Sequence, residues 1–524
     1  MIIIWSAYDH ALPIHDSAWH LLHGLKCRDL LAHAHLRSSA WWQALLAVNP
    51  LYPPFVYLVY GTLALILGPQ PWVALLARLL FSNVLFASIY GLGKLIFKNA
   101  AIALFSAVIV FIYPEVFLYT HYNMLDMPGL AMVSLVLFCL TWWQQKSSCY
   151  SSTALGLACA LTALTKSSSF AFIVAPLLVS AGLSLLKRDT QRIKSLALAG
   201  LVSLTIMLPW LIFGLQPMLK AINDIQQQSS KTGCADMFSF KDNFLYYILN
   251  LPSLLSPFLL IIAIFAFCLA PKKAHQWMFY LLLSAIGGIL LLSLFHWVPL
   301  VKYALPAVIP IALYTARASV SYWQQQKLRP LLIVLVTAVC FAFVEISFSP
   351  YPLPRLSLSE DVKNFLGIPL VRKGQYYPPG GISSYPMMPN DWGHDWVLNT
   401  IKPRINAKNQ TLAIMSDTAE ASSATYTYLA KRNNLALVVF TPRSWTMRGE
   451  DMPPFRLDSA KLVTWYLLET KGATNPAFPF FNKASDCNYQ RWCSYVRKSG
   501  QFQLIGTKSL PEGNGLELYQ NQSY

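Results

Sequence analysis

The sequence predicts a polytopic α-helical membrane protein, with many spans followed by a C-terminal extracytoplasmic α/β domain. The 524 residues are 55% hydrophobic and only 12% charged, whereas soluble domains carry about 25% charged residues. Apolar runs recur as far as about residue 348, and most are long enough to cross a bilayer core of roughly 30 Å. Beyond that point the chain is polar and rich in proline. We therefore expect a membrane part followed by one soluble domain.

The formal charge of +17 has two explanations at the level of composition. Nucleic-acid-binding proteins carry such a charge, and so do membrane proteins with basic cytoplasmic loops. The basic residues here cluster in short loops between apolar runs. We therefore expect a lipid bilayer, and no nucleic acid, as the partner of this charge.

Residues 1–71 are expected to form a first outer loop with juxtamembrane helices. Residues 1–5 are an apolar stub that reads as the end of a span, so most of a first span is expected to be lacking; a start upstream of Met1 and a truncated chain are both compatible with this stub. The run 52–68 is apolar, begins Tyr-Pro-Pro and is followed by Pro-Gln-Pro. Its composition fits either a span or a helix lying against the membrane face.

Residues 72–348 are expected to form a transmembrane core of about ten spans. A long outer loop, 215–252, interrupts them and is polar in its middle, so that it could order over a bound substrate. The expected spans lie near residues 72–93, 100–119, 127–143, 151–165, 168–186, 195–214, 253–270, 277–295, 303–318 and 330–348.

The charge of the loops fixes the expected orientation. If residues 9–71 lie outside, most basic loop residues fall on the cytoplasmic side, as the positive-inside rule requires. Counting 52–68 as a span would reverse every loop, so we interpret that run as juxtamembrane. The basic loop residues are Lys94, Lys98, Lys146, Lys187, Arg188, Arg192, Lys194, Lys272, Lys273, Arg317, Lys327 and Arg329.

Residues 349–524 are then expected to form a soluble α/β domain outside a bacterial inner or plasma membrane. Strand-like runs at 412–415, 436–440, 462–466 and 502–505 alternate with helix-like stretches at 419–432 and 488–498. Cys487 and Cys493 lie six residues apart in this domain. In an extracytoplasmic compartment, a local disulfide and two free thiols are both compatible with that spacing.

In this topology two carboxylates and three cations fall on the outer face of the membrane. A carboxylate can accept a hydroxyl proton, and fixed cations can stabilise a departing phosphate. This combination suits a reaction between an anionic lipid head group and an acceptor hydroxyl. The candidate residues are Asp16, Asp126, Arg78, Lys166, Lys302 and its neighbour Tyr303.

Each candidate also has a simpler interpretation. Asp16 and Asp126 could cap the helices that follow them, and Lys166 and Lys302 could extend to the membrane interface. Asp9 reads as a solvated loop residue. His10, His15, His20 and His23 suggest a metal site, but their spacing matches no metal-binding pattern. We therefore expect no metal or cofactor; a divalent metal is the less favoured alternative.

The order of these motifs resembles the GT-C type glycosyltransferases that use polyprenyl-phosphate sugars, and in particular the branch of protein O-mannosyltransferases and the lipid A aminoarabinose transferase. No single motif is specific, but six occur in the family's order between residues 14 and 310. They are Asp16-Ser17, Tyr52-Pro53-Pro54-Phe55, Arg78-Leu79, Leu125-Asp126-Met127-Pro128, Gly156-Leu157 with Leu164-Thr165-Lys166, and Lys302-Tyr303-Ala304-Leu305-Pro306.

The resemblance implies an inverting glycosyltransferase that moves a sugar from a polyprenyl phosphate to a hydroxyl of a protein, glycolipid or polysaccharide. It implies Asp16 as general base and Asp126 as the residue that orients the acceptor or sugar. Arg78, Lys166, Lys302 and Tyr303 would hold the lipid phosphate. The chain departs from the family where Ser17 replaces an acidic residue and Lys302 replaces arginine, and where a first complete span would precede Asp16.

Two other function classes fit the composition. A polytopic lipid or sugar transporter or flippase also has many spans and charged membrane residues, but its binding site is expected near the bilayer midplane. A membrane scaffold could use the C-terminal domain to bind a partner. The charged candidate residues are expected at one membrane face, and this favours the glycosyltransferase over both alternatives.

Overall fold

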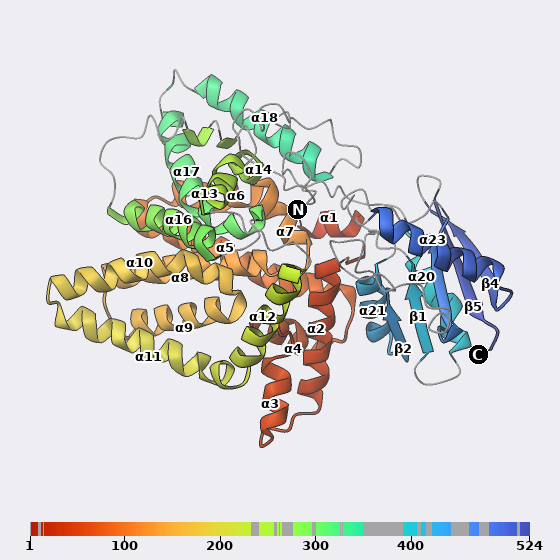
Figure 1. Cartoon of the computed structure of the whole chain (residues 1–524). Coiled ribbons are helices and arrows are strands. Elements are labelled where there is room, and N and C mark those ends of the chain that lie inside the picture. Colours follow the sequence, from red (N-terminus) through yellow and green to blue (C-terminus); the bar gives the residue numbers. More distant parts are fainter. Residues whose placement is uncertain are drawn as a thin grey trace.

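The computed structural model consists of a long helical part followed by a smaller part built on a β-sheet (Figure 1). This arrangement confirms the predicted fold class. The structure describes residues 2–8, 12–13, 15–231, 240–255, 259–260, 262–264, 276–295, 300–324, 326, 329–348, 391–405, 410–415, 422–441, 461–470, 482–510 and 514–523.

The chain opens with helices α1 (Ile2–Tyr8), α2 (His15–Ala32), α3 (Ser39–Leu46) and α4 (Phe55–Leu67). The packing of α2 on α4 is close, because a Cβ added at Gly24 would lie 2.0 Å from Cδ1 of Tyr60. Helix α4 has 13 residues. At 1.5 Å per residue it is roughly 20 Å long, which is short of the bilayer core. A helix of this length is compatible with the juxtamembrane interpretation of residues 52–68.

The membrane part follows from α5 onwards. Its elements are α5 (Pro71–Phe97), α6 (Ala100–Ile112), α7 (Pro114–His121), α8 (Asp126–Gln145), α9 (Cys149–Thr165), α10 (Ser167–Leu186), α11 (Thr190–Phe213), α12 (Leu215–Lys231), α13 (Phe240–Leu249), α14 (Leu251–Leu255), α16 (Gln276–Phe295), the 3-10 helix η1 (Val301–Ala307), α17 (Val308–Gln324) and α18 (Arg329–Phe348).

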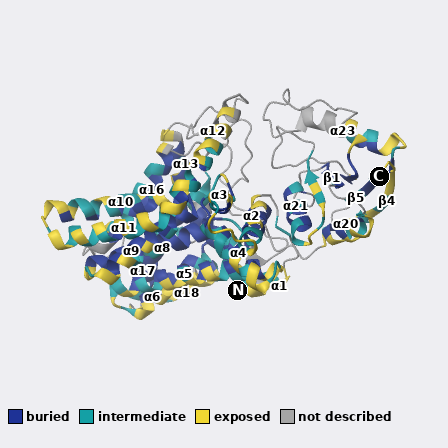
Figure 2. Cartoon of the chain, turned by 90° about the horizontal axis from the view of Figure 1, so that it is seen from below, coloured by how far each residue is buried: buried dark blue, intermediate teal, exposed yellow. Residues whose placement is uncertain are grey.

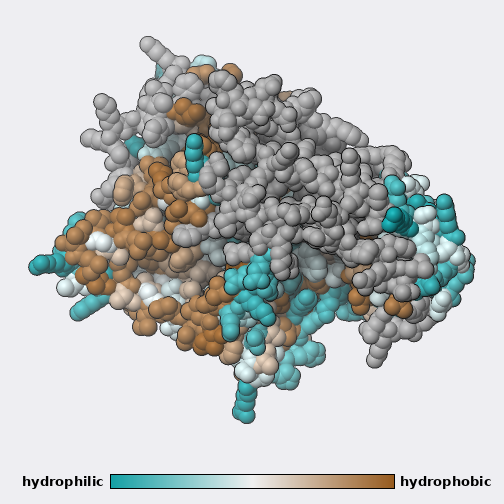
Figure 3. All heavy atoms as spheres, viewed as in Figure 1, coloured by the Kyte–Doolittle hydropathy of each residue, from teal (hydrophilic) through white to brown (hydrophobic). Residues whose placement is uncertain are grey.

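Five described stretches are long and apolar enough to cross a membrane, namely α5, α8, α10, α11 and the stretch Val301–Gln324. Shorter apolar helices stand at 55–67, 149–165, 278–294 and 329–341. The predicted span 253–270 lies mostly outside the described residues. Apolar side chains cover the helical part, whereas polar side chains gather over the sheet (Figure 3).

The predicted span 100–119 differs from the structure, which divides it into α6 and α7 with a bend of 72°. Pro114 is the first residue of α7, a position where its missing N–H breaks no helical hydrogen bond. Tyr113, the residue before it, is extended with φ −62° and ψ 124°, as expected before a proline. The bend directs α7 towards the loop that precedes α8.

Helix α8 lies at the centre of the membrane part (Figure 2). In the apolar 18-residue window of α8, 83% of the residues are buried, whereas in that of α11 only 11% are buried. The side chains of α11 are therefore available to face lipid, whereas those of α8 face protein. A charged residue on α8 must consequently find its partner inside the molecule.

The C-terminal part is a mixed sheet of five strands in the order β2-β1-β3-β5-β4. Strands β2, β1 and β3 are parallel, and β5 and β4 continue the sheet antiparallel. All five residues of β3 are buried, which identifies it as the central strand. The elements are α20 (His394–Ile401), η3 (Lys402–Arg404), β1 (Gln410–Ile414), α21 (Ser423–Arg432), β2 (Leu437–Phe440), β3 (Trp465–Glu469), α23 (Asn482–Lys498), β4 (Phe502–Ser509) and β5 (Gly515–Asn521).

Strand β3 begins three residues later than the predicted run 462–466, and β5 was not predicted. Helix α23 carries both Cys487 and Cys493. The side chain of Cys487 lies outside the described residues, so the choice between a local disulfide and two free thiols stays a prediction from the sequence.

The sheet domain is held against the start of the chain through α21 and α2 (Figure 1). Residues of α2, α4 and α5 share one hydrophobic cluster with residues of the sheet domain. At the edge of this contact, Oγ1 of Thr425 donates to the carbonyl of Pro13 at 2.8 Å, and Lys431 pairs with Asp29. The helix that carries Asp16 is thus fixed from both sides.

Candidate active site

Four charged side chains from distant parts of the chain pair at one end of the membrane helices. Asp16 lies in the first turn of α2 and Asp126 in the first turn of α8. Lys166 is the single residue between α9 and α10, and Lys302 belongs to η1. Nζ of Lys166 lies 2.5 Å from Oδ1 of Asp126, and Nζ of Lys302 lies 3.8 Å from Oδ2 of Asp16.

The Asp126–Lys166 pair is buried, with side-chain exposures of 1% and 5%. A close approach of α8 and α10 makes it possible, because a Cβ at Gly129 would lie 2.3 Å from Oγ of Ser169. The second carboxylate oxygen of Asp126, Oδ2, is buried and accepts no hydrogen bond from the described residues. This oxygen is available to a hydroxyl group of a bound molecule.

The Asp16–Lys302 pair is more open. The Asp16 side chain is 64% exposed and that of Lys302 is 16% exposed. Asp16 therefore keeps access to solvent or substrate, whereas Asp126 does not. Two carboxylates of the same type thus have different environments, one open beside a cation and one buried and neutralised by a cation.

Tyr303 connects the two pairs. Its ring lies 4.5 Å from Nζ of Lys166 and 5.8 Å from Nζ of Lys302. Both distances allow attraction between the ammonium groups and the π-face of the ring. The ring thus lies within reach of the ammonium groups of both ion pairs.

A polar cluster that the sequence did not predict lies behind these pairs. Nδ1 of His20 is hydrogen-bonded to the Tyr57 hydroxyl at 2.8 Å, and Nδ2 of Asn49 donates to the same hydroxyl at 2.9 Å. The His20 ring meets the Tyr52 ring edge to face at 5.4 Å. Burial lowers the pKa of His20 to about 4, although the charges of Asp16 and Asp126 act in the opposite direction. His20 is therefore neutral at pH 7.

The pKa of Tyr52 is raised, mainly by burial and further by the charges of Asp16 and Asp126. Its hydroxyl therefore stays protonated, and the negative charges of both carboxylates act on it. One sequence signal could have found His20: it lies four residues after Asp16, on the same face of a helix. Tyr52 was noted only as the start of the Tyr-Pro-Pro motif.

Ser17 and Arg78 fix the loop that leads to Asp126. The backbone N–H of Asn123 donates to Oγ of Ser17 at 3.1 Å, which ties α2 to this loop. Arg78, on α5, donates through Nη1 to the carbonyl of His121 at the end of α7. Arg78 thus lies near the same end of the helices as Asp126, with its guanidinium engaged by the backbone five residues before Asp126.

Not all candidate residues can be placed. Asp9 and His10 lie outside the described residues, and the side chain of His15 is not described. His23 is hydrogen-bonded through Nδ1 to the carbonyl of Trp19 at 2.7 Å. Within the described part of the chain, no three His, Cys, Asp or Glu side chains are grouped in a way that could hold a metal ion.

The site lies at the ends of membrane helices. Asp126 is the first residue of α8, and Lys166 immediately precedes α10. Neither residue is near the middle of a helix, where a transporter is expected to bind its cargo. These residues therefore do not form a binding site near the middle of the membrane helices, as the transporter alternative would require.

Comparison with known proteins places this geometry in a family context. Residues 52–213 match the family model of the dolichyl-phosphate-mannose-protein mannosyltransferases. This segment contains Arg78, Asp126 and Lys166, whereas Asp16 and Lys302 lie outside it. No curated protein sequence matches the chain.

Two solved structures share the fold over nearly their whole length. ArnT from Cupriavidus metallidurans bound to undecaprenyl phosphate is 15% identical, with a TM-score of 0.62, over 99% of this chain and 96% of that one. The apo state of the same ArnT is 14% identical, with a TM-score of 0.58, over 98% and 96% of the two chains. At these identities the likeness concerns the fold. Over nearly its whole length the chain is therefore similar in fold to membrane glycosyltransferases of the GT-C type, and its segment 52–213 is similar in sequence to the mannosyltransferase family.

Proposed function

We propose that the enzyme transfers a sugar from a polyprenyl phosphate to a hydroxyl group at the outer membrane face. The observation that carries this proposal is the pairing of Asp16 with Lys302 at 3.8 Å. An open carboxylate and a cation lie side by side where a base and a phosphate-binding group are both needed. The ArnT structure with undecaprenyl phosphate supports a donor of this class.

In the proposed reaction the acceptor oxygen attacks the anomeric carbon of the sugar. A new carbon–oxygen bond forms as the bond from this carbon to the lipid phosphate breaks. Asp16 accepts the acceptor's proton, and Lys302 stabilises the negative charge that develops on the leaving phosphate. A single displacement of this kind inverts the configuration at the anomeric carbon.

Asp126 has a different proposed role. Because Lys166 neutralises it and both are buried, it is poorly placed to exchange a proton with solvent. Its open oxygen Oδ2 suits a hydrogen bond from a hydroxyl of the sugar or acceptor. We assign Lys166 chiefly to holding Asp126, and Lys302 with Tyr303 to the lipid phosphate. Arg78 supports the site through the loop before Asp126.

The acceptor is proposed only as a class, namely a hydroxyl of a protein, glycolipid or polysaccharide. The sheet domain is held against α2 by the contact of α21, so it is positioned to cover the site or select the acceptor. We propose that both lie outside a bacterial inner membrane, because the basic loops then lie inside.

The test uses the purified full chain, reconstituted in bilayer discs, with labelled polyprenyl-phosphate sugars and envelope fractions as acceptors. Label that moves to an acceptor in an Asp16-dependent manner supports the proposal. Asp16→Asn is expected to lower turnover by a factor of about 10² to 10⁴, the usual contribution of a general base. The control is Asp395→Asn, on the exposed face of α20. Full turnover by Asp16→Asn would overturn the assignment of the base.

A further inference from the structure

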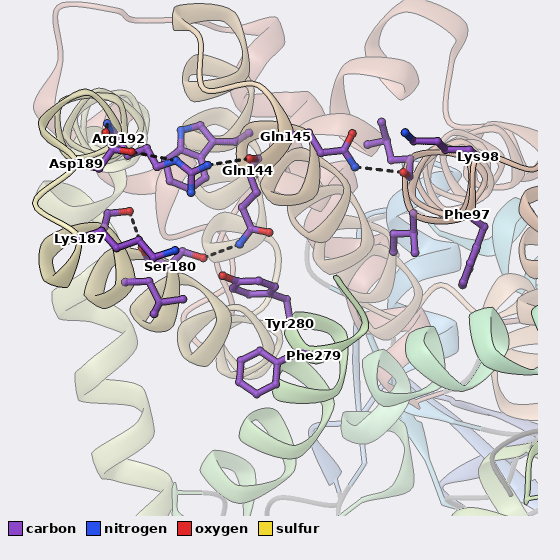
Figure 4. Close-up of a pocket in the computed structure, with 15 residues that line it drawn as sticks. Phe97, Lys98, Gln144, Gln145, Ser180, Lys187, Asp189, Arg192, Phe279 and Tyr280 are labelled. Carbon is purple, nitrogen blue, oxygen red and sulfur yellow. Dashed lines mark hydrogen bonds and ion pairs between the residues drawn. The ribbon is translucent and has the colours of Figure 1, made fainter. Parts of the chain in front are cut away.

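A second site lies at the opposite end of the membrane helices. A hollow of about 960 Å³ opens between the ends of α5, α8 and α10 and the beginnings of α11 and α16 (Figure 4). Helix α8 has 20 residues, so its last residue, Gln145, lies roughly 28 Å along the axis from Asp126. The hollow is therefore on the membrane face that the basic loops predict to be cytoplasmic, and it is separate from the candidate active site.

The hollow carries an excess of positive charge. Lys98 and Lys187 are exposed at its edge, and Asp189 is the one acidic residue among those that line it. Asp189 accepts from the backbone N–H of Arg192 at 3.0 Å and pairs with its Nε at 3.4 Å. Arg192 therefore neutralises Asp189. Neither lysine ammonium pairs with a carboxylate of the described residues, so two positive charges remain for a ligand.

Gln144 supplies an unused acceptor inside the hollow. Its side chain is buried, with 7% exposed, and Nε2 donates to Oγ of Ser180 at 3.0 Å. Its Oε1 accepts no hydrogen bond from the described part of the chain. A buried carbonyl without a donor is costly. Oε1 is therefore a candidate acceptor for a hydroxyl or an amine of a bound molecule.

Several other polar groups of the hollow are engaged with the protein itself. Nε1 of Trp143 donates to Oγ of Ser195 at 2.7 Å, and the Trp143 ring carries the guanidinium of Arg192 at 5.9 Å. Nε2 of Gln145 donates to the carbonyl of Leu95 at 3.2 Å. The groups on which a ligand site would depend are thus two lysine charges and one amide oxygen.

Apolar side chains line the edge of the same hollow. Leu183 on α10 is 39% exposed and Phe279 on α16 is 54% exposed, and both belong to helices of the membrane part. Acyl chains would contact such residues from the bilayer. The hollow therefore combines positive charge, a hydroxyl acceptor and apolar contacts at one membrane face.

We propose that this hollow binds the head group of an anionic phospholipid that carries a free hydroxyl, a glycerol phosphodiester. The ammonium groups of Lys98 and Lys187, at the edge of the hollow, would attract the anionic head group, and its hydroxyl would donate to Oε1 of Gln144. Basic pockets between membrane helices on the cytoplasmic side are known to suit anionic lipid head groups. A soluble glycerophosphate shares the head-group chemistry but lacks the apolar contacts.

The experiment measures lipid binding by native mass spectrometry of the purified full chain. The probes are phosphatidylglycerol, phosphatidylmethanol, which has the same charge but no hydroxyl, phosphatidylcholine, and soluble glycerophosphoglycerol. The expected order of affinity is phosphatidylglycerol, then phosphatidylmethanol, then phosphatidylcholine. Equal binding of phosphatidylglycerol and phosphatidylcholine would overturn the proposal, and so would binding of the soluble head group as tight as that of the lipid.

Variants test the lysine charges and the amide oxygen of Gln144 separately. The double variant K98Q/K187Q is expected to weaken binding of both anionic lipids by about thirtyfold, since each lysine near an anionic head group contributes about 1 kcal/mol. Lys146→Gln, on the same membrane face but outside the hollow, is the matched control and should change binding little. If the double variant binds as the native protein does, the site assignment is wrong.

Gln144→Met removes the acceptor at similar side-chain length. It is expected to abolish the preference for phosphatidylglycerol over phosphatidylmethanol while binding of phosphatidylmethanol persists. Ser180→Ala breaks the internal hydrogen bond but keeps Oε1, so it should retain the preference. Persistence of the preference in Gln144→Met would refute the role of this residue. Sugar transfer is not needed for any of these readouts, so the outcome is independent of the proposed reaction.

Discussion

Nζ of Lys166 lies 2.5 Å from Oδ1 of Asp126, and the two side chains are almost completely buried where α8 begins and α9 turns into α10. The pair joins the central helix of the membrane part to its neighbour. Each charge is tolerated in this place because the other is present. Stability and activity should consequently respond differently to its removal.

Asp126→Asn and Lys166→Met should each lower the free energy of unfolding by about 3 to 5 kcal/mol, because each leaves a buried charge without its partner. The double variant should recover most of that loss, since it buries no charge. It should still lack activity, because the carboxylate oxygen proposed to bind a hydroxyl is gone. Unfolding in detergent and turnover are measured on all three variants; a double variant less stable than both single variants would contradict this explanation.

Lys302 tests the contribution of charge near the lipid phosphate. Lys302→Gln should lower kcat/KM for the donor about tenfold to a hundredfold, because hydrogen bonds to charged groups are worth about 1.5 to 3 kcal/mol. Lys302→Arg should retain activity, since it keeps the charge and adds a planar fork that suits phosphate. The control is Lys26→Gln on the exposed side of α2. Native kcat/KM in Lys302→Gln would exclude this lysine from donor binding.

The sequence was sufficient to bring the candidate charges to one face. Asp16, Asp126, Lys166 and Lys302 were selected from motif order and loop charge, and the structure pairs them as two ion pairs. The sequence does not predict which carboxylate pairs with which lysine. Hydropathy indicates where a helix ends, but not whether Lys166 points to Asp126 or to a ligand, because that depends on how closely α8 and α10 approach at Gly129.

Other features could not be predicted for different reasons. The bend at Tyr113 follows from the proline after it, but the continuous apolar run concealed the break. Among the four histidines near the start, helical spacing relates His20 to Asp16, but only the fold places His20 beside Tyr57 and buries it. Strand β5 alternates weakly and begins with glycine, so its place beside β3 depends on pairing with distant residues.

The buried histidine predicts a pH dependence of stability. The pKa of His20 is lowered from 6.5 to about 4, chiefly by burial. Between these values the unfolded chain binds a proton that the folded chain does not, so acid favours unfolding. The contribution of His20 is complete above pH 6.5 and is lost as the pH falls towards 4, by up to about 3 kcal/mol.

Unfolding temperature measured from pH 7 to pH 4 should therefore fall less steeply in His20→Gln than in the native protein. Tyr57→Phe is the matched control, because it removes the hydrogen bond to His20 but keeps the imidazole. It should lower stability at every pH while retaining most of the slope. Identical slopes for the native protein and His20→Gln would show that another group dominates the acid response.

The orientation of the chain is tested by reporter fusions in a bacterial host. Alkaline phosphatase, active only outside the inner membrane, should be active when fused after Tyr524 and inactive when fused after Lys146, in the loop between α8 and α9. Green fluorescent protein at the same two positions should give the opposite pattern. This outcome follows from the basic loops being retained inside. The reversed pattern would place the sheet domain and the Asp16–Lys302 pair in the cytoplasm.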